Sequence, residues 1–156
     1  MFPVVNELRR QAKLVGWVFT QLTDVEYELN GLVHYDRTDK SDMCTRYGVS
    51  LRDVFGDDAV VFEALPGVSS DPAADSTWTL GLSNWSTGIT DTYTIRLRWA
   101  DAAPVATTTV TAPPYALTWV TVSVPARGTS GEDVLVAEIY DSAGRVAARN
   151  RLRVSR

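Results

Sequence analysis

The feature that most constrains this chain is a two-residue alternation of apolar and polar side chains in its C-terminal part. In the stretch "TYTIRLRWA", Tyr93, Ile95, Leu97 and Trp99 alternate with threonine and arginine. Successive side chains of a strand point to opposite faces, so this pattern indicates a strand with one buried face. Seven such segments follow one another without helices between them, at residues 59–65, 76–86, 92–100, 105–112, 117–125, 133–142 and 145–155. They predict an antiparallel β-sandwich of immunoglobulin-like type, with segment 105–112 at a sheet edge.

The alternation also predicts which side chains fill the core of the sandwich. The expected core consists of Trp78, Leu80, Ile95, Leu97, Val120, Val122, Leu135, Ile139 and Leu152. The last segment places Arg149, Arg151 and Arg153 on the opposite, solvent-facing side of its strand.

The N-terminal part has a different character. Apolar residues at helical spacing predict a helix at about 4–14, ended by Gly16. The stretch "WVFTQ" at 17–21 predicts a short strand that is buried on both faces, as in a parallel sheet. Residues 22–58 are polar and irregular, with a helical turn expected in "DVEYEL" and a short helix in "VSLRDVFGDD". The chain therefore divides into residues 1–58, which are part of an α/β unit, and a sandwich domain at residues 59–156.

The segment "GWVFTQLTDVEYELNGLVHYDR" resembles the end of the barrel in glycoside hydrolase family 2, the β-galactosidase, β-glucuronidase and β-mannosidase family. Fourteen positions match the family pattern, namely Gly16, Thr20, Gln21, Leu22, Asp24, Val25, Glu26, Glu28, Asn30, Gly31, Leu32, Tyr35, Asp36 and Arg37. The resemblance implies that residues 1–58 are a remnant of the last unit of a (β/α)8 barrel, with 17–21 as its eighth strand. It further implies that the sandwich is the domain that follows the barrel.

This resemblance also implies an activity that the chain cannot carry out alone. Family members hydrolyse β-glycosides with retention, and this chemistry needs two carboxyl groups about 5–5.5 Å apart. Both catalytic glutamates belong upstream of the predicted helix, and no residue here matches either position. We therefore assign no catalytic residue and no cofactor. The chain is interpreted as the catalytically silent C-terminal fragment or accessory domain of a retaining β-glycosidase.

The carboxylates and amides after segment 17–21 are the candidate site, because barrel enzymes bind substrate at the C-terminal ends of their strands. Gln21, Asp24 and Glu26 are the candidates for the rim of a sugar site in an intact parent protein. A solvated acidic loop with capping roles remains open for most of this cluster. Tyr35, Asp36 and Arg37 are interpreted as bracing the loop by local hydrogen bonds.

A second class of function is a carbohydrate-binding, structural or oligomerisation module built on the sandwich. Trp85 and Trp119 are its candidate sugar-stacking residues, since neither falls on a predicted core face. Packing against the missing barrel explains these tryptophans equally well.

Charge and composition weigh against several other classes of protein. Residues 1–78 hold 13 acidic and 7 basic side chains, whereas residues 79–156 hold 6 acidic and 8 basic ones. An acidic chain without a concentrated basic face is not typical of a nucleic-acid binder. A metal site is not expected: His34 lacks further ligands at usable spacing, and the carboxylates of Asp53, Asp57 and Asp58 lack the calcium-loop pattern.

Cys44 is the single cysteine of the sequence, so no internal disulfide forms. No apolar stretch is long enough to span a membrane, and no signal peptide is visible. The compartment stays unknown, because these observations say little if the chain is a fragment.

Segments 4–14 and 17–21 lack the sheet neighbours that an α/β unit requires, so their partner is the missing barrel portion or a substitute for it. The apolar side chains and backbone groups of 17–21 need cover. Without the barrel, we expect the segment to be poorly ordered, docked on the sandwich or paired with a second copy of the chain. A self-associated form is the preferred expectation.

Overall fold

The computed structural model describes eight strands and two helices. It describes residues 2–11, 13–14, 18, 21–38, 40, 50–64, 68–69, 74–85, 88–100, 102–127 and 132–155. The elements are α1 (Phe2–Arg10), α3 (Leu51–Phe55), β1 (Ala59–Phe62), β2 (Val68–Ser69), β3 (Ser76–Asn84), β4 (Asp91–Trp99), β5 (Ala106–Ala112), β6 (Ala116–Val124), β7 (Asp133–Tyr140) and β8 (Val146–Ser155). Neither of these helices is long and apolar enough to cross a bilayer.

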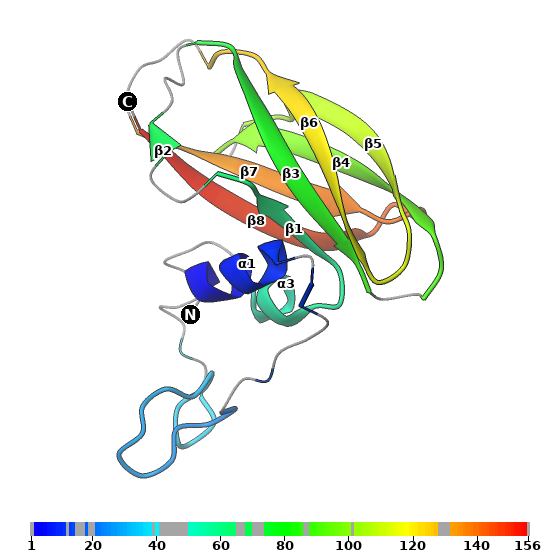
Figure 1. The fold of residues 1–156 in the computed structure, drawn as a ribbon. Helices are drawn as coiled ribbons and strands as arrows, with labels where there is room; N and C mark the ends of the chain where they lie inside the picture. The colour runs from blue at the N-terminus through cyan, green and yellow to red at the C-terminus, as the bar shows by residue number, and fades with distance from the viewer. Residues whose placement is uncertain are drawn as a thin grey trace.

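The strands form two facing sheets, as the alternation predicts (Figure 1). One sheet has the order β1-β3-β6 and the other the order β2-β8-β7-β4-β5. The paired strands are antiparallel except for β2 and β8, which pair in parallel. Consecutive strands lie in different sheets except for the pairs β4–β5 and β7–β8. This is an immunoglobulin-like β-sandwich, and β5 is an edge strand as expected.

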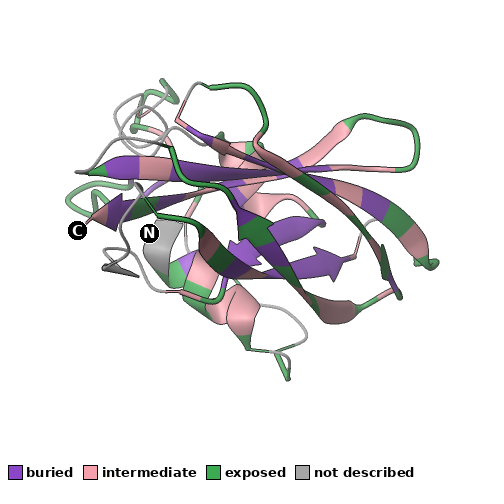
Figure 2. Cartoon of the chain, turned by 90° about the horizontal axis from the view of Figure 1, so that it is seen from above, coloured by how far each residue is buried: buried purple, intermediate pink, exposed green. Residues whose placement is uncertain are grey.

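The core lies between the sheets and contains the predicted side chains. Eight of the nine predicted core residues are buried, and Val120 is half-buried and packs against the others. In Figure 2, buried and exposed positions alternate along several strands. Tyr93 and Trp99 are the two largest fully buried side chains, and both lie on the inward face of β4.

Strand β7 departs from the simple alternation. Val136 and Glu138 lie on its outer face, yet 0% and 7% of their surfaces are exposed. Glu138 is covered because the arginines of the neighbouring strands converge on it, through Arg98 Nη2 at 3.3 Å and Arg149 Nε at 2.8 Å. The predicted outward face of β8 is confirmed, because its three arginines alternate with buried residues, but only Arg153 is exposed, whereas Arg149 and Arg151 are half-buried.

Helix α1 begins earlier than predicted and ends at Arg10 instead of residue 14. It ends early because the chain tightens into three-residue turns, in which Gln11 donates to the Leu8 carbonyl and Leu14 to the Gln11 carbonyl. The Arg10 guanidinium donates to the Phe62 carbonyl at 2.7 Å from Nε. The helix therefore docks beside β1, at the edge of the sandwich (Figure 1).

The short helix predicted in "VSLRDVFGDD" is present as α3. Ser50 starts it with a capping box: its Oγ accepts from the Asp53 N–H, and the Asp53 carboxylate accepts from the Ser50 N–H at 2.7 Å. The Arg9 guanidinium fixes α3 to α1 by donating to the Val54 and Gly56 carbonyls. Asn6 links α1 to Asn150 of β8, and α3 also contacts that strand. The boundary at residue 58 stays a prediction.

The strand predicted at 17–21 falls mostly outside the described residues. Val18 and Gln21 are described, and neither belongs to a strand. Val18 is 94% exposed instead of buried. The prediction of a strand buried on both faces is wrong at these two positions, because a strand needs paired neighbours and the sandwich supplies none here.

Candidate functional site

The candidate site is the loop at residues 21–40, which holds the carboxylates and amides singled out in the sequence. It projects from the rest of the molecule beside the helices (Figure 1). Asp24 lies at its centre and is 3% exposed. Its Oδ1 accepts from the Gly31 N–H at 2.9 Å and from Lys40 Nζ at 2.6 Å, and its Oδ2 lies 3.8 Å from His34 Nδ1. One carboxylate therefore joins three separate parts of the loop.

Backbone hydrogen bonds complete the structure of the loop. The Asp24 N–H donates to the Val33 carbonyl and the Val33 N–H to the Leu22 carbonyl, at 3.1 and 3.0 Å. The expected helical turn is instead a tight turn in which Val25 and Glu28 exchange two backbone hydrogen bonds. Local backbone pairing thus replaces the sheet that this segment lacks.

Gly31 allows the two arms of the loop to approach closely. A Cβ at this position would lie 2.3 Å from the Asp24 backbone nitrogen and 2.9 Å from Asp24 Oδ1. No larger residue fits without moving the backbone. The Asn-Gly pair of the motif therefore has a steric reason in this structure.

The Lys40 ammonium, by its hydrogen bond, is the largest influence on the Asp24 carboxyl and holds its pKa below the ordinary value. Burial opposes this effect, and the Gly31 N–H and the charges of Lys40 and His34 add to it. Asp24 is therefore an ionised anchor. Its position and bonding suit it to hold the loop in shape.

The other predicted rim residues lie at the loop surface. Gln21 Nε2 is 3.5 Å from Glu28 Oε2 and 3.4 Å from Asn30 Oδ1, so these three side chains gather in one polar group. Glu26 is exposed and has a positive φ of 53°, at the tip of the turn. The structure therefore brings together Gln21, Glu28 and Asn30, with Asp24 beneath the surface.

Five large apolar side chains of the loop are exposed to solvent. They form what we call the loop's apolar surface, which consists of Leu22, Val25, Tyr27, Leu29 and Tyr35. Tyr27 is 97% exposed and Leu29 is 75% exposed. Five such residues within one short loop make this loop the candidate contact surface of the chain.

The loop-bracing role predicted for Asp36 is observed with a different partner. Asp36 Oδ1 accepts from the Thr38 N–H at 3.0 Å and from the Thr38 hydroxyl at 2.6 Å. These bonds from Thr38 are the largest influences that lower the pKa of the Asp36 carboxyl. Arg37 takes a positive φ of 66° in this turn, and the expected bond between Asp36 and Arg37 is replaced by the one to Thr38.

The two candidate stacking tryptophans occupy separate places on the sandwich. Trp85 follows β3, is half-buried and packs edge-to-face on Tyr115, with the ring centroids 5.4 Å apart. Trp119 lies on the outer face of β6 opposite Gly81, and 42% of it is exposed. A Cβ on Gly81 would lie 2.9 Å from the Trp119 ring, so one part of the ring rests on that backbone.

The aspartates considered for calcium have structural roles. Asp53 caps α3, and Asp58 is buried, where it accepts from the Trp85 N–H at 3.0 Å and from the Tyr93 hydroxyl at 3.2 Å. Among the described residues, no group of three or more potential metal ligands occurs. Cys44 lies outside the described residues.

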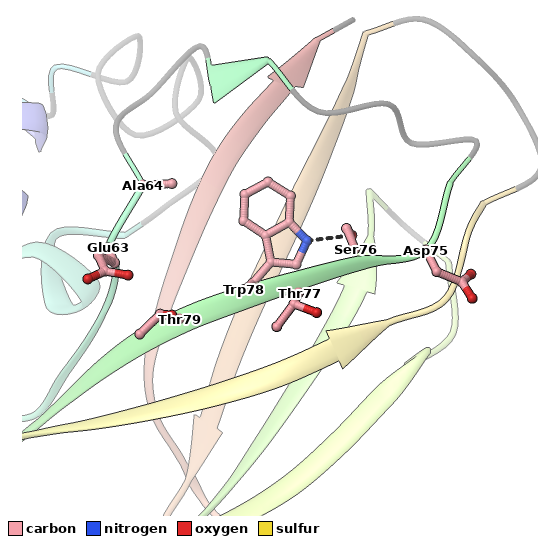
Figure 3. Close-up of a pocket in the computed structure, with 7 residues that line it drawn as sticks. All are labelled: Glu63, Ala64, Asp75, Ser76, Thr77, Trp78 and Thr79. Carbon is pink, nitrogen blue, oxygen red and sulfur yellow. Dashed lines mark hydrogen bonds between the residues drawn. The ribbon is translucent and has the colours of Figure 1, made fainter.

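The sandwich carries two shallow hollows that the sequence did not indicate. The first has a volume of about 470 Å³ and lies between the end of β1 and the start of β3. Figure 3 shows Glu63 and Asp75 at its two ends, with the indole of Trp78 between them. Trp78 is 5% exposed and donates to Ser76 Oγ at 2.7 Å, so its ring belongs to the core and offers no stacking face.

The second hollow has a volume of about 460 Å³ and lies on the outer face of the five-stranded sheet, beside Arg96 and Tyr140. Two strands and a turn that are distant in sequence form it. Alternation places Arg96 on an outer face, but it does not show that Tyr140 lies beneath its guanidinium.

Comparison with known proteins gives likeness at the level of the fold. No model of a known protein family matches the sequence, and no curated protein matches it. Among solved structures, a FixG-related protein from Vibrio parahaemolyticus matches 64% of this chain and 94% of its own, at 14% identity and a TM-score of 0.44.

Two glycosidase structures are similar over the same share of this chain. A β-glucuronidase from glycoside hydrolase family 2 matches 63% of this chain at 14% identity and a TM-score of 0.39. A β-galactosidase from Bacteroides fragilis, described as putative in its name, matches 64% at 11% identity and a TM-score of 0.38. The matched parts make up 11% and 16% of those two chains.

Proposed function

We propose that this chain is the non-catalytic C-terminal part of a retaining β-glycosidase related to glycoside hydrolase family 2. In this proposal, the loop at 21–40 contributes to the rim of a sugar site whose catalytic groups lie in the rest of the protein. The sandwich at 59–156 serves as the accessory domain. The fourteen matching positions in residues 16–37 support the assignment.

The observation that carries the proposal is the contrast between the inside and the outside of the loop. Inside, Asp24 and Gly31 hold the backbone in one shape. Outside, Leu22, Tyr27 and Leu29 leave 68%, 97% and 75% of their surfaces in water. A loop that is fixed in shape and apolar outside is suited to a partner surface, and the missing barrel portion is the partner we propose.

The residues of the loop take distinct roles in this proposal. Gln21, Glu28 and Asn30 present amide and carboxylate groups that can bind sugar hydroxyls, and Glu26 flanks them at the tip. Asp24 acts as a positioning residue, because its Oδ1 already accepts two hydrogen bonds within the loop. The proposed rim therefore keeps Gln21 and Glu26 from the sequence prediction and adds Glu28 and Asn30, while Asp24 supports the loop from inside.

Hydrolysis of nitrophenyl β-galactoside, β-glucuronide and β-mannoside tests whether the chain is silent alone. We expect no turnover by the pure chain, since the pair of carboxyl groups that retention requires is not assigned to it. Turnover that disappears in Glu26→Gln and persists in Glu63→Gln, an exposed glutamate at a distance from the loop, would show that the acidic cluster is catalytic and refute the proposal.

The parent protein can be tested directly from the coding region upstream of residue 1. An in-frame barrel with two glutamates at strand ends is the expected finding. A region without such a barrel removes the proposed partner. Self-association, the expectation preferred from sequence, then becomes the explanation of the loop's apolar surface. Sedimentation at several concentrations measures self-association, and it should be compared between the chain and the double variant Tyr27→Ser, Leu29→Ser.

Trp119 supports a second candidate function, a carbohydrate-binding sandwich. It is a large aromatic residue on an outer sheet face with 42% of its surface exposed. Trp85 is the weaker candidate, because Tyr115 already packs on it. A glycan array probed with the chain and with Trp119→Ala separates the two functions: binding that is lost in the variant favours the sugar-binding module, and an array without signal leaves Trp119 as a packing residue.

A further inference from the structure

The second hollow, on the outer face of the five-stranded sheet, lies apart from the loop and from Trp119. Its lining consists of Thr92, Thr94, Arg96, Tyr140, Asp141, Ser142 and Gly144. Strand β4 supplies the first three of these, and β7 with the turn after it supplies the others. The register of the sheet places Thr94 opposite Tyr140 and Arg96 opposite Glu138. Its volume of about 460 Å³ is within the range of about 300–1,000 Å³ typical of small-ligand sites.

Arg96 is the exposed cationic side chain of this hollow. Its guanidinium carbon lies 4.3 Å from the centre of the Tyr140 ring, a cation–π contact that does not use the N–H donors. None of these donors has an acceptor among the residues that the structure describes. The guanidinium therefore lies over an aromatic ring, and its donors face solvent, where a ligand can reach them.

The neighbouring charges keep Arg96 available to a ligand. Glu138 is the nearest acidic group across the sheet, but Arg98, Arg149 and the Tyr140 hydroxyl already donate to it, the last at 3.1 Å. Burial by itself would raise the pKa of Glu138, but the hydrogen bond and charge of Arg149 and the charge of Arg98 hold it below its ordinary value.

The other polar side chains that line the hollow are either paired within the protein or able to bind a hydroxyl group. Asp141 is engaged by Arg145, whose Nε and backbone N–H both donate to it at 2.8 Å. The Ser142 hydroxyl donates to Asp91 at 3.3 Å, which leaves its oxygen free to accept a hydrogen bond. The Thr94 hydroxyl is half-exposed at the floor of the hollow.

The charge of the whole sheet face favours an anion. The outer positions of β4, β7 and β8 carry one buried glutamate and five arginines, namely Arg96, Arg98, Arg149, Arg151 and Arg153. Arg153 is paired with Glu132 at 3.0 Å, near the end of the sheet. Among the residues that line the hollow, Arg96 is the cationic side chain, and the acidic Asp141 is paired with Arg145.

We propose that this hollow binds the carboxylate of an anionic saccharide, with Arg96 as the carboxylate-binding residue. A guanidinium presents parallel N–H donors that match the two oxygens of a carboxylate. Thr94 and Ser142 bind the hydroxyl groups of the same sugar unit. The carboxylate site follows from the geometry alone, whereas the choice of a saccharide rests on the proposed function.

The test is an NMR titration of the full chain with methyl β-glucuronide and with methyl β-glucoside, which differ only in the carboxylate. We expect the glucuronide to shift the amide signals of residues 92–96 and 140–144 and to bind at least about tenfold more tightly than the glucoside, as one charge-assisted contact predicts. Equal affinity of the two sugars, or no shift of these amides, overturns the proposal.

Two variants identify the residue. Arg96→Gln is expected to weaken glucuronide binding by at least about tenfold. Arg153→Gln removes the same charge from the same sheet face outside the hollow, and its affinity should match the wild type. Equal losses in both variants would mean that only the general charge matters and would overturn the role of Arg96. The unfolding midpoint of each variant shows that the fold is intact.

Acetate serves as the control for a simple anion. If acetate produces the same shifts with the same affinity as the glucuronide, the hollow binds a carboxylate and the saccharide part is wrong. These results are independent of the catalytic test. A chain that hydrolyses nitrophenyl glycosides would refute the proposed function and leave the titration unchanged, and a failed titration would leave the loop's role untouched.

Discussion

The loop at 21–40 depends on the absence of a side chain at residue 31, so Gly31→Ala is the sharpest perturbation of the candidate site. The added Cβ would lie 2.3 Å from both the Asp24 nitrogen and the Thr23 carbonyl carbon, and real Cβ atoms do not approach backbone so closely. The two arms of the loop must therefore move apart by several tenths of an ångström or more. This movement breaks or lengthens the bond from the Gly31 N–H to Asp24 Oδ1.

The magnitude follows from the bonds at risk. The bond to the Asp24 carboxylate is charge-assisted, a type that contributes about 1.5–3 kcal/mol, and the flanking bonds of Asp24 and Val33 contribute about 0.5–1.5 kcal/mol each. Losing the first alone raises the open population of the loop by at least about tenfold. The core of the sandwich has no part in these bonds, so its stability should stay unchanged.

Hydrogen exchange of backbone amides measures this effect residue by residue. The amides of Asp24 and Val33 should lose at least about tenfold protection in Gly31→Ala, while those of Ile95 and Leu97 keep theirs. Gly144→Ala is the control, because a Cβ there meets nothing within 4 Å and the strain that its φ of +75° imposes on an alanine stays in a turn far from the loop. Unchanged protection at Val33 in Gly31→Ala, or an equal loss in Gly144→Ala, would refute the steric argument.

Three further predictions concern the sandwich. Leu97→Ala, at a fully buried core position, should lower the free energy of unfolding in urea by about 2–5 kcal/mol. Leu29→Ala, at an exposed position, should change it by less than about 0.5 kcal/mol, and similar losses in the two variants would mean that the core faces are misassigned. Tyr93→Phe removes a buried hydroxyl whose proton is shared between Asn84 Oδ1 at 3.0 Å and Asp58 Oδ2 at 3.2 Å, so it should cost about 1–3 kcal/mol by the same assay, and a neutral result would show that these bonds add nothing. The folded-state pKa of Glu138 lies below the unfolded value of 4.5, so this carboxylate stabilises the fold above that pH and its contribution is lost as pH falls through the folded pKa. The free energy of unfolding should therefore fall less steeply from neutral to acidic pH in Glu138→Gln than in the wild type. Identical slopes in the variant and the wild type would contradict this.

Local sequence patterns were sufficient to predict the sandwich architecture and most of its core. The inward faces of β3, β4 and β7 follow from alternation, because a side chain in a strand has only two directions and the core accepts apolar groups on one of them. Alternation failed at Glu138 for a physical reason that the pattern does not contain. Burial of that carboxylate depends on Arg98 and Arg149, which reach it from two different strands.

In the N-terminal part, local sequence patterns predicted less of the structure than they did in the sandwich. Helical spacing predicted α1 but placed its end four residues too late, because the chain tightens into turns after Arg10, which is bonded to Phe62 at the edge of the sandwich, while Arg9 is bonded to the end of α3. The strand expected at 17–21 is wrong at Val18 and Gln21, the two of its positions that the structure describes. A strand is stable only when its backbone groups are paired, and a run of apolar residues does not show whether a partner is present.

For the candidate site, the sequence selected the residues, and the tertiary structure decided where they lie. The motif singled out Gln21, Asp24 and Glu26 as one polar group, yet the fold places Asp24 inside the loop and leaves the other two at the surface. The hollow beside Arg96 was invisible in the sequence, since Tyr140 lies 44 positions away and only the pairing of β4 with β7 places them together. Alternation is a property of a single strand and can be read along the chain. A binding site joins several strands, and its geometry exists only once their register is fixed.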